Sequence, residues 1–256
     1  MTATPADAAV HRRVEIVMGL PISLALRGRH ATGPRADAAW AEMLSVLHEA
    51  DRVFSRYRPD SPISRLGRGE LDVADCPPEV AEVLALAEEA RRVSGGAFDV
   101  RRPGMPLDTD GVVKGWAVQR AAQALDALEE TDGCLSGGGD MVCVVRDEAG
   151  EPWRVGIEDP RDPRRVLAVV PIRRGAVATS GAAHRGDHVV HAVTGRPPEG
   201  VASVTVVGDD LTWADIDATA AYAMGRDALD WLRTRRGRSG LVVWADGSTD
   251  TFAVPA

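Results

Sequence analysis

The sequence predicts an α+β fold in which antiparallel sheets carry a few packed helices within a single globular unit. Strand-like and helix-like runs do not alternate regularly along the chain, which disfavours a doubly wound parallel sheet. Most strand-like runs gather in the second half of the chain. No internal repeat or low-complexity linker interrupts the 256 residues.

The first half of the chain contains two expected strands and three expected helices. Residues 12–28 have the pattern of two strands broken near Gly19-Leu20-Pro21. Residues 36–55 carry apolar side chains at helical spacing. Residues 78–94 form the clearest helix, with a proline at the start and Gly95-Gly96 at the end. A further helix is expected to start near Gly115.

From Leu135 onward the pattern favours strands. They are expected in "MVCVVRD", "WRVGIED", "VLAVVPI", "GAVATSG", "HVVHAVTG" and "VASVTVVG". A helix within residues 212–225 follows, and the chain ends in a hairpin with Asp246-Gly247 as its tight turn. We expect residues 1–12 to be a disordered tail and residues 13–256 to form one domain.

Composition restricts the partners and the compartment of the protein. The formal net charge of -8 disfavours nucleic acid as a partner. Three cysteines without CxxC spacing suggest neither a zinc site nor a disulfide framework. The N-terminus lacks an apolar run long enough for a signal peptide, and no later segment has the length and apolarity of a membrane span. We therefore expect a cytoplasmic protein without a membrane anchor.

The stretch "TWADIDATAAYAMG" has two interpretations. Thr212 and Asp215 have the spacing of a capping box at a helix start, with a carboxylate in the positive first turn. Asp215 and Thr219 also lie four residues apart, on one face of the expected helix. Their oxygen atoms are of the kind that a hard cation such as Mg²⁺ binds. The stretch alone leaves a capped helix and a metal site open.

Three other stretches carry groups that could bind an anion or a metal. In "GGAFDVRRPGMPLDTDGVVKGWA", Lys114 and glycines near an expected helix start suggest an anion site. "SGGGDM" places three glycines at the entry to a strand, which suggests a bulge or a close backbone approach. His184, His188 and His191 lie close together in sequence, but His188 and His191 would point to opposite faces of a strand, which disfavours a zinc triad.

Taken together and in order, these stretches resemble the ApbE family, the FAD:protein FMN transferases. The segments that carry the resemblance are "MGLPISL", "FSRYRPDSPISRL", "GGAFD", "LDTDGVVKGWAV", "SGGGD", "VATSG" with "HVVHAVTG", and "ADIDAT". They cover nearly the whole chain. The resemblance implies an ApbE-like, T-fold-related arrangement of antiparallel sheets with packed helices.

The resemblance also implies an activity. Members of the family bind FAD with Mg²⁺ and move its FMN half onto a threonine or serine hydroxyl of a target flavoprotein, with release of AMP. It implies that Mg²⁺ is held by Asp215, Thr219 and the carbonyl of Gly111. His188, Lys114 and Asp215 are the implied catalytic residues. The implied FAD-binding residues are Met18, Ser55, Tyr57, Ala97, Phe98, Asp99, Asp108, Lys114, Thr179, Ser180 and Val190.

The chain departs from the family pattern at several positions. Only eight residues, Val100 to Leu107, separate "GGAFD" from "LDTDG", where many members carry a longer insertion, so we expect a compact cytoplasmic branch. The alternatives to an FMN transferase are an FAD pyrophosphatase, which yields FMN and AMP, and a non-catalytic FAD carrier. The substituted positions are Leu20 (usually threonine), Gly67 (asparagine), Trp116 (tyrosine), Gln119 (aspartate) and His191-Ala192 (aspartate-proline).

Overall fold

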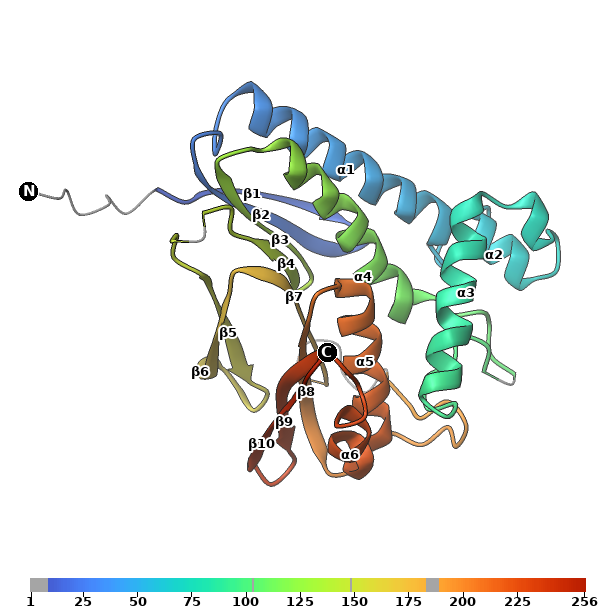
Figure 1. Cartoon of the computed structure of the whole chain (residues 1–256). Helices are drawn as coiled ribbons and strands as arrows, with labels where there is room; N and C mark the ends of the chain where they lie inside the picture. Colours follow the sequence, from blue (N-terminus) through green and yellow to red (C-terminus); the bar gives the residue numbers. More distant parts are fainter. Residues whose placement is uncertain (1–8, 103, 148, 183–188) are drawn as a thin grey trace, which may run out of the picture.

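An eight-stranded antiparallel sheet forms the centre of the protein (Figure 1). The computed structural model describes residues 9–102, 104–147, 149–182 and 189–256. The strands follow the spatial order β1-β2-β3-β4-β7-β8-β9-β10. Their bounds are β1 (His11–Val17), β2 (Leu20–Gly28), β3 (Thr131–Gly137), β4 (Asp140–Val144), β7 (Arg174–Gly181), β8 (Val201–Gly208), β9 (Arg238–Trp244) and β10 (Thr249–Val254).

Helices cover one face of this sheet (Figure 1). α5 packs against β7 and β8, and α4 packs against α5, α1 and β3. Among the described residues, no helix combines the length and the apolar character needed to cross a bilayer. The helix bounds are α1 (Pro34–Phe54), α2 (Pro62–Gly67), α3 (Pro78–Val93), α4 (Asp110–Ala121), α5 (Leu211–Met224) and α6 (Ala228–Leu232), with 3₁₀ turns at Val73–Asp75, Ala122–Ala127 and Gly225–Asp227.

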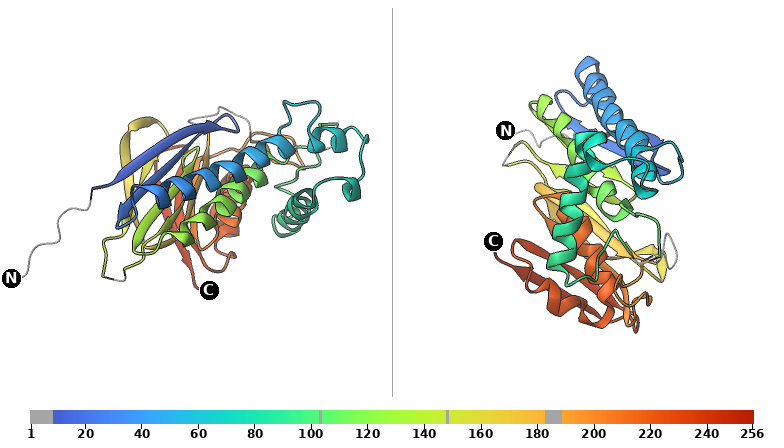
Figure 2. Two further views of the ribbon diagram at one scale, coloured as in Figure 1. Left: turned by 90° about the horizontal axis from the view of Figure 1, so that it is seen from above. Right: turned by 90° about the vertical axis from the view of Figure 1, so that its right-hand side faces the viewer.

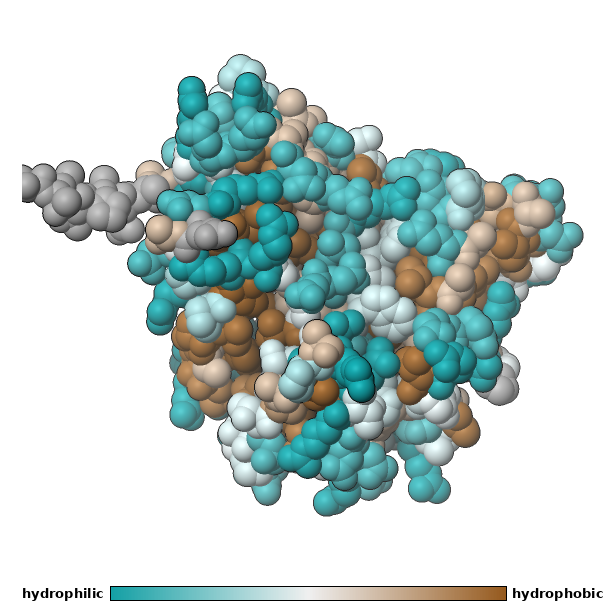
Figure 3. Space-filling view, in the orientation of Figure 1, coloured by the Kyte–Doolittle hydropathy of each residue, from teal (hydrophilic) through white to brown (hydrophobic). Residues whose placement is uncertain are grey.

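The opposite face carries a separate two-stranded sheet of β5 (Trp153–Asp159) and β6 (Asp162–Ile172) (Figure 2). The hairpin buries Val155 and Ile172 against Cys143 and Val177 of the large sheet. Its outer side includes the exposed Val166 and Val169. Figure 3 shows hydrophobic residues gathered on this side of the molecule, where Figure 1 places β5 and β6.

The predicted α+β class with antiparallel sheets and packed helices is confirmed. Within a strand, side chains alternate between the two faces of the sheet. In β2, Ile22, Leu24 and Leu26 point to the helix-covered core, and the residues between them are less buried. The early strand pair and the helices at residues 36–55 and 78–94 also lie where they were predicted. β1 begins at His11, two residues before the expected start of the domain.

Two predicted element boundaries are wrong. α4 begins at Asp110, not near Gly115, because the Thr109 carbonyl already accepts hydrogen bonds from the amides of residues 112 and 113, at 3.0 Å each. Glycine is a poor helix former, so its presence obscured the first turn of α4 in the sequence. The strand-rich part, expected from Leu135 onward, already begins at Thr131 with β3, which pairs with the end of β2.

The strand predicted for "HVVHAVTG" is wrong over its described part, residues 189–195, which form a loop and a turn. β7 pairs directly with β8 and leaves no place between them for this segment. The loop closes on itself through a 2.7 Å hydrogen bond from the Gly195 amide to the His191 carbonyl. The Ala192 amide donates to the Ala97 carbonyl at 3.0 Å, so the loop lies against the GGAFD segment.

Candidate active site

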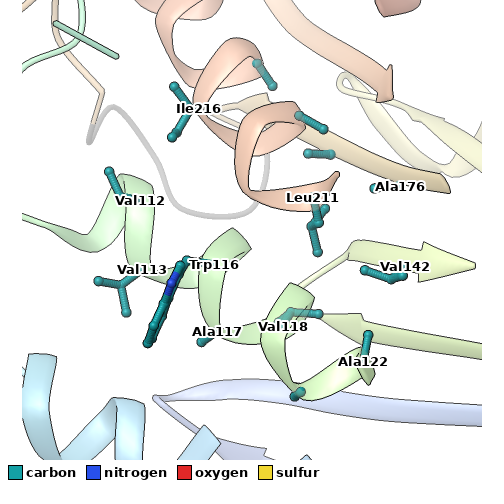
Figure 4. Close-up of a cluster of buried hydrophobic side chains, with 14 of the residues drawn as sticks. Val112, Val113, Trp116, Ala117, Val118, Ala122, Val142, Ala176, Leu211 and Ile216 are labelled. Atoms are coloured by element: carbon teal, nitrogen blue, oxygen red, sulfur yellow. The ribbon is translucent and has the colours of Figure 1, made fainter. Parts of the chain in front are cut away.

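The site is built where α4 and α5 approach closely, and Gly115 permits that approach. A β-carbon at Gly115 would lie 2.8 Å from the Leu211 carbonyl oxygen and 2.9 Å from the Asp215 β-carbon. The Gly115 amide donates a 3.0 Å hydrogen bond to Asp215 Oδ2. Gln119 Oε1 accepts a 2.7 Å hydrogen bond from the Leu211 amide, which fixes the first turn of α5 to α4. Apolar side chains of both helices pack around these contacts (Figure 4).

The predicted capping box at the start of α5 is wrong. Asp210 is the N-cap, and its Oδ1 accepts a 3.0 Å hydrogen bond from the Trp213 amide. Thr212 therefore lies inside the first turn of the helix, and Asp215 lies in the second turn, away from the unpaired amides. Since Asp215 does not cap the helix, its burial needs another explanation.

Three charged side chains meet at this helix contact. Lys114 Nζ lies 3.1 Å from Asp215 Oδ1 and also contacts Asp140 Oδ2. Asp140 and Asp215 are 2% and 1% exposed, so the two carboxylates share one ammonium group almost out of water. Burial raises the pKa of Asp215 to about 7, against the opposing effect of Lys114. As carboxylates, the pair leaves one negative charge uncompensated by Lys114.

Asp140 is the residue that sequence reasoning missed. It begins β4, directly after the three glycines of "SGGGD", and its Oδ1 accepts a 2.9 Å hydrogen bond from the Thr179 amide. Thr179 Oγ1 in turn lies 2.9 Å from Thr205 Oγ1. An acidic residue at the end of a glycine run was the available signal. Only the packing of α4 against β4 in the folded protein shows that it faces Lys114.

The three predicted metal-binding residues lie on facing parts of α4 and α5. A β-carbon at Gly111 would lie 2.9 Å from the Phe98 ring and 3.9 Å from the Thr219 methyl group. Gly111 on α4 and Thr219 on α5 are therefore neighbours, and Phe98 packs beside them. Thr219 Oγ1 lies 3.0 Å from Ser180 Oγ at the end of β7. Asp215 is one helical turn before Thr219 on α5.

The chemistry of these donors can be compared with that of known metal sites. Within the described residues, no group of three or more His, Cys, Asp or Glu side chains is placed to hold a metal ion. A site formed by Asp215, Thr219 and Gly111 would combine carboxylate, hydroxyl and carbonyl oxygens. That donor set fits a hard cation such as Mg²⁺, and it does not fit zinc, which prefers imidazole and thiolate ligands.

The predicted flavin-binding residues surround the same end of the helices. Asp108, just before α4, lies 3.3 Å from Arg56 Nε, and Arg56 also pairs with Asp110 at 2.6 Å. The loop that carries Ser55 and Tyr57 is therefore held beside the start of α4. The Ser55 carbonyl accepts hydrogen bonds from two serine hydroxyls of its own loop, at 2.7 and 3.3 Å. Tyr57 is 89% exposed, which leaves its ring open to a ligand.

The remaining predicted residues lie in three turns and loops. Met18 has a positive φ of 55° in the β1–β2 turn, at the end of the sheet that also carries Asp140. The Ala97 carbonyl contacts the loop of residues 189–195, which includes Val190. Asp99 Oδ1 accepts a 2.7 Å hydrogen bond from the Arg101 amide. His188, the predicted proton acceptor, lies outside the described residues.

Three departures from the family pattern have a defined place in the structure. Gln119, where aspartate is usual, holds the start of α5. Trp116, where tyrosine is usual, donates a 2.8 Å hydrogen bond from Nε1 to Glu82 Oε1, and so links α4 to α3. His191, where aspartate is usual, has a buried Nδ1 without a hydrogen-bond partner among the described residues.

Known proteins resemble this chain in sequence. The ApbE family model matches residues 18–102 and 100–242. A Rhodobacter capsulatus protein named FAD:protein FMN transferase is 34% identical over 203 residues, which cover 71% of this chain and 38% of that protein. A protein of the same name from Vibrio cholerae is 30% identical over 244 residues and covers 73% of each chain. The chain thus spans well under half the length of the first of these relatives.

Solved structures show the same fold. The crystal structure of the ApbE protein from Thermotoga maritima superposes with a TM-score of 0.82 at 23% identity, over 94% of this chain and 96% of that one. The flavin transferase ApbE from Vibrio cholerae gives a TM-score of 0.79 at 21% identity, over 96% and 97% of the two chains. By the family match and the Vibrio cholerae relative together, the chain belongs to the ApbE family.

Proposed function

We propose that this chain is an FAD:protein FMN transferase. The observation that carries the proposal is the buried Asp140–Lys114–Asp215 group, in which, among the described residues, two carboxyl groups share one ammonium group close to Gly111 and Thr219. When both carboxyls are ionised, Lys114 balances only one of the two negative charges. Such a place suits a pyrophosphate that arrives with a divalent cation. The names of the curated relatives support the same activity.

The reaction we propose transfers a phosphoryl-linked group. A threonine or serine hydroxyl of a target flavoprotein attacks the phosphorus of the FMN half of FAD. The new oxygen–phosphorus bond forms as the bond from that phosphorus to the bridging oxygen breaks, so AMP leaves and takes the electron pair. The hydroxyl proton passes to a base. The protein contributes positioning and charge neutralisation, since phosphoryl transfer needs little else from its catalyst.

The residues present fit a bound Mg²⁺. Asp215, the Thr219 hydroxyl and the Gly111 carbonyl would hold it, and the ion would neutralise charge on the phosphate oxygens. Lys114 Nζ lies 3.1 Å from Asp215 Oδ1, so its ammonium group is close enough to neutralise charge on the same phosphate oxygens. Gln119 and Gly115 keep the two helices, and with them the two sets of donors, in register.

For the proton we propose His188, because an imidazole accepts protons near neutral pH. His188→Ala should slow FMN transfer more than it weakens FAD binding. Transfer is followed by mass spectrometry, and binding by quenching of flavin fluorescence. An equal loss in both measurements would make His188 part of the binding pocket and would remove it as the base.

The first test is to incubate the chain with FAD, Mg²⁺ and a candidate flavoprotein acceptor. Intact mass spectrometry should show one FMN added to an acceptor threonine or serine, and chromatography should show an equal amount of AMP. Free FMN and AMP with an unlabelled acceptor would instead indicate an FAD pyrophosphatase. Intact FAD throughout, with binding retained, would indicate a carrier without turnover. Omission of the acceptor and addition of EDTA are the matched controls.

A further inference from the structure

Two cysteines face each other on the sheet, on the side away from the helices. Cys134 of β3 and Cys143 of β4 are direct cross-strand partners. Their sulfurs are 3.5 Å apart, and the Cys143 thiol donates a hydrogen bond to the Cys134 sulfur. Both are free cysteines, Cys143 buried and Cys134 partly accessible. The third cysteine, Cys76, lies on a different part of the chain, before α3.

The register of this hairpin brings the two backbones close together. β3 and β4 are joined by a two-residue turn, Gly138-Gly139, with positive φ values of 61° and 100° that favour glycine. The closing pair of such a turn, Gly137 and Asp140, exchanges hydrogen bonds, and the pairs alternate from there. Cys134 and Cys143 are the third pair after it, which is a non-hydrogen-bonded pair, with a Cα separation of about 4.5 Å. That separation lies within the range of disulfides.

The surroundings distinguish the two thiols. Val155 and Ile172 of the β5–β6 hairpin cover Cys143, together with Val177. Cys134 is only partly buried at the margin of this cluster. Cys134 is therefore the more accessible sulfur for a small oxidant. The buried sulfur of Cys143 lies in contact with it.

Charge makes the same distinction. Across the sheet, Arg12 pairs with Ala25 and Ala25 pairs with Cys134, so these residues form one row on the same face. The hydrogen bond from Cys143 lowers the pKa of Cys134, and the Arg12 guanidinium adds to the effect. Donating that bond, together with burial, raises the pKa of Cys143. Cys134 thus carries the greater thiolate character, and thiolates are the nucleophilic form.

We propose that Cys134 and Cys143 are a peroxide-reactive thiol pair that closes to a disulfide, with Cys134 as the attacking and Cys143 as the resolving cysteine. The Cys134 sulfur attacks one oxygen of a hydroperoxide, so an S–O bond forms and the O–O bond breaks. With H₂O₂, water leaves and Cys134 becomes a sulfenic acid. The Cys143 sulfur then attacks Cys134, and the S–O bond breaks with loss of a second water. Two thiols and one H₂O₂ give one disulfide and two waters.

The test counts thiols in the folded protein. The wild-type chain is treated with limiting H₂O₂, quenched with catalase, and alkylated with excess iodoacetamide in denaturant at mildly alkaline pH, where free thiols ionise and react. The number of alkylated cysteines should fall from three to one, with Cys76 the one that stays alkylated. Reduction followed by N-ethylmaleimide should then label Cys134 and Cys143 in peptide maps. In Cys76→Ser the count should fall from two to none.

A resolving-cysteine variant tests the assigned order. In Cys143→Ala, dimedone should trap a sulfenic acid on Cys134 at least tenfold more than in wild type, because no second thiol removes it. Retention of three alkylated thiols after peroxide would overturn the proposal, as would a disulfide that includes Cys76 or a second chain. Equal dimedone labelling of wild type and Cys143→Ala would overturn it too. Since every readout is a mass, the result does not depend on flavin transfer.

Discussion

The buried carboxylates on the two sides of α5 differ in the number of cations that surround them. Asp215 and Asp217 are two residues apart, and they are 1% and 0% exposed. Asp217 faces Arg235 and Arg238, each 3.0 Å from one of its oxygens. Asp215 faces Lys114, which it shares with Asp140. Among the described residues, one side of the helix therefore has two cations for one carboxylate, and the other has one cation for two.

This difference distinguishes a structural ion pair from the proposed binding site. A buried carboxylate costs free energy unless it is paired and hydrogen-bonded, and Asp217 has both of its oxygens paired with guanidinium groups. Trp213 and Trp231 pack near the Arg235 guanidinium and close that side of the helix. Within the described residues, the Asp215 side has one ammonium group for two carboxyl groups, so it is short of one positive charge when both are ionised. A ligand that brings a divalent cation would supply it.

The largest effect is expected from Asp215→Ala. Removal of the proposed metal-binding carboxylate should lower FMN transfer by about a thousandfold or more, since metal stabilisation of charge is worth several kcal/mol and about 1.4 kcal/mol is tenfold in rate. The unfolding transition should stay cooperative, because the variant also removes one of two carboxylates that share Lys114. Mass spectrometry of the acceptor and a thermal melt measure the two effects. Full transfer in this variant would remove Asp215 from the mechanism.

The next effect is expected from Asp217→Ala, on the other side of the same helix. It leaves two largely buried guanidinium groups without their carboxylate, which should lower the free energy of unfolding by about 3 kcal/mol. Urea denaturation measures this loss. At temperatures where the variant is folded, Mg²⁺-dependent transfer should remain within about threefold of wild type, since a twofold-to-threefold change is well under 1 kcal/mol. A thousandfold loss of transfer in the folded variant would erase the contrast between the two sides.

The smallest effect is expected from Gln119→Ala. It removes the acceptor for the Leu211 amide at the start of α5, and should cost about 1 kcal/mol of stability, the usual worth of one hydrogen bond. We expect the Mg²⁺ concentration for half-maximal transfer to rise, because the two halves of the site are no longer tied together. Gln119→Glu keeps an acceptor oxygen and serves as the matched control. If both variants behave alike, the hydrogen bond does not position the site.

Much of the fold could be predicted from local patterns. The strands of residues 11–28, the helices around residues 36–55 and 78–94 and the last hairpin follow from apolar spacing, prolines, glycines and the Asp246-Gly247 turn. The start of α4 could not be predicted, because Gly111 and Gly115 are unfavourable in an isolated helix. Glycine is required at both positions in the folded protein, because a side chain would collide with the Phe98 ring at Gly111 and with the backbone of α5 at Gly115.

The candidate site shows the same division. Residue types and spacing mark Lys114, Asp215 and Thr219 as candidate anion-binding or metal-binding residues. The family resemblance assigns each of them a role. Local pattern placed the helix cap on the wrong residues, since both Thr212 and Asp210 are good caps and only the folded backbone selects Asp210. It also suggested a strand at residues 189–195, where the direct pairing of β7 with β8 leaves a loop.

The sequence by itself determined the α+β class, the family and the chemical groups at the site, because these depend on residue types and on periodicities within single segments. Tertiary structure alone decided which charges meet. Asp140 reaches Lys114 only through the packing of α4 against β4, and Cys134 meets Cys143 only through the register of β3 with β4. Two carboxylates on one helix, identical in type and two residues apart, lie in different charge environments because long-range packing gives them different cations.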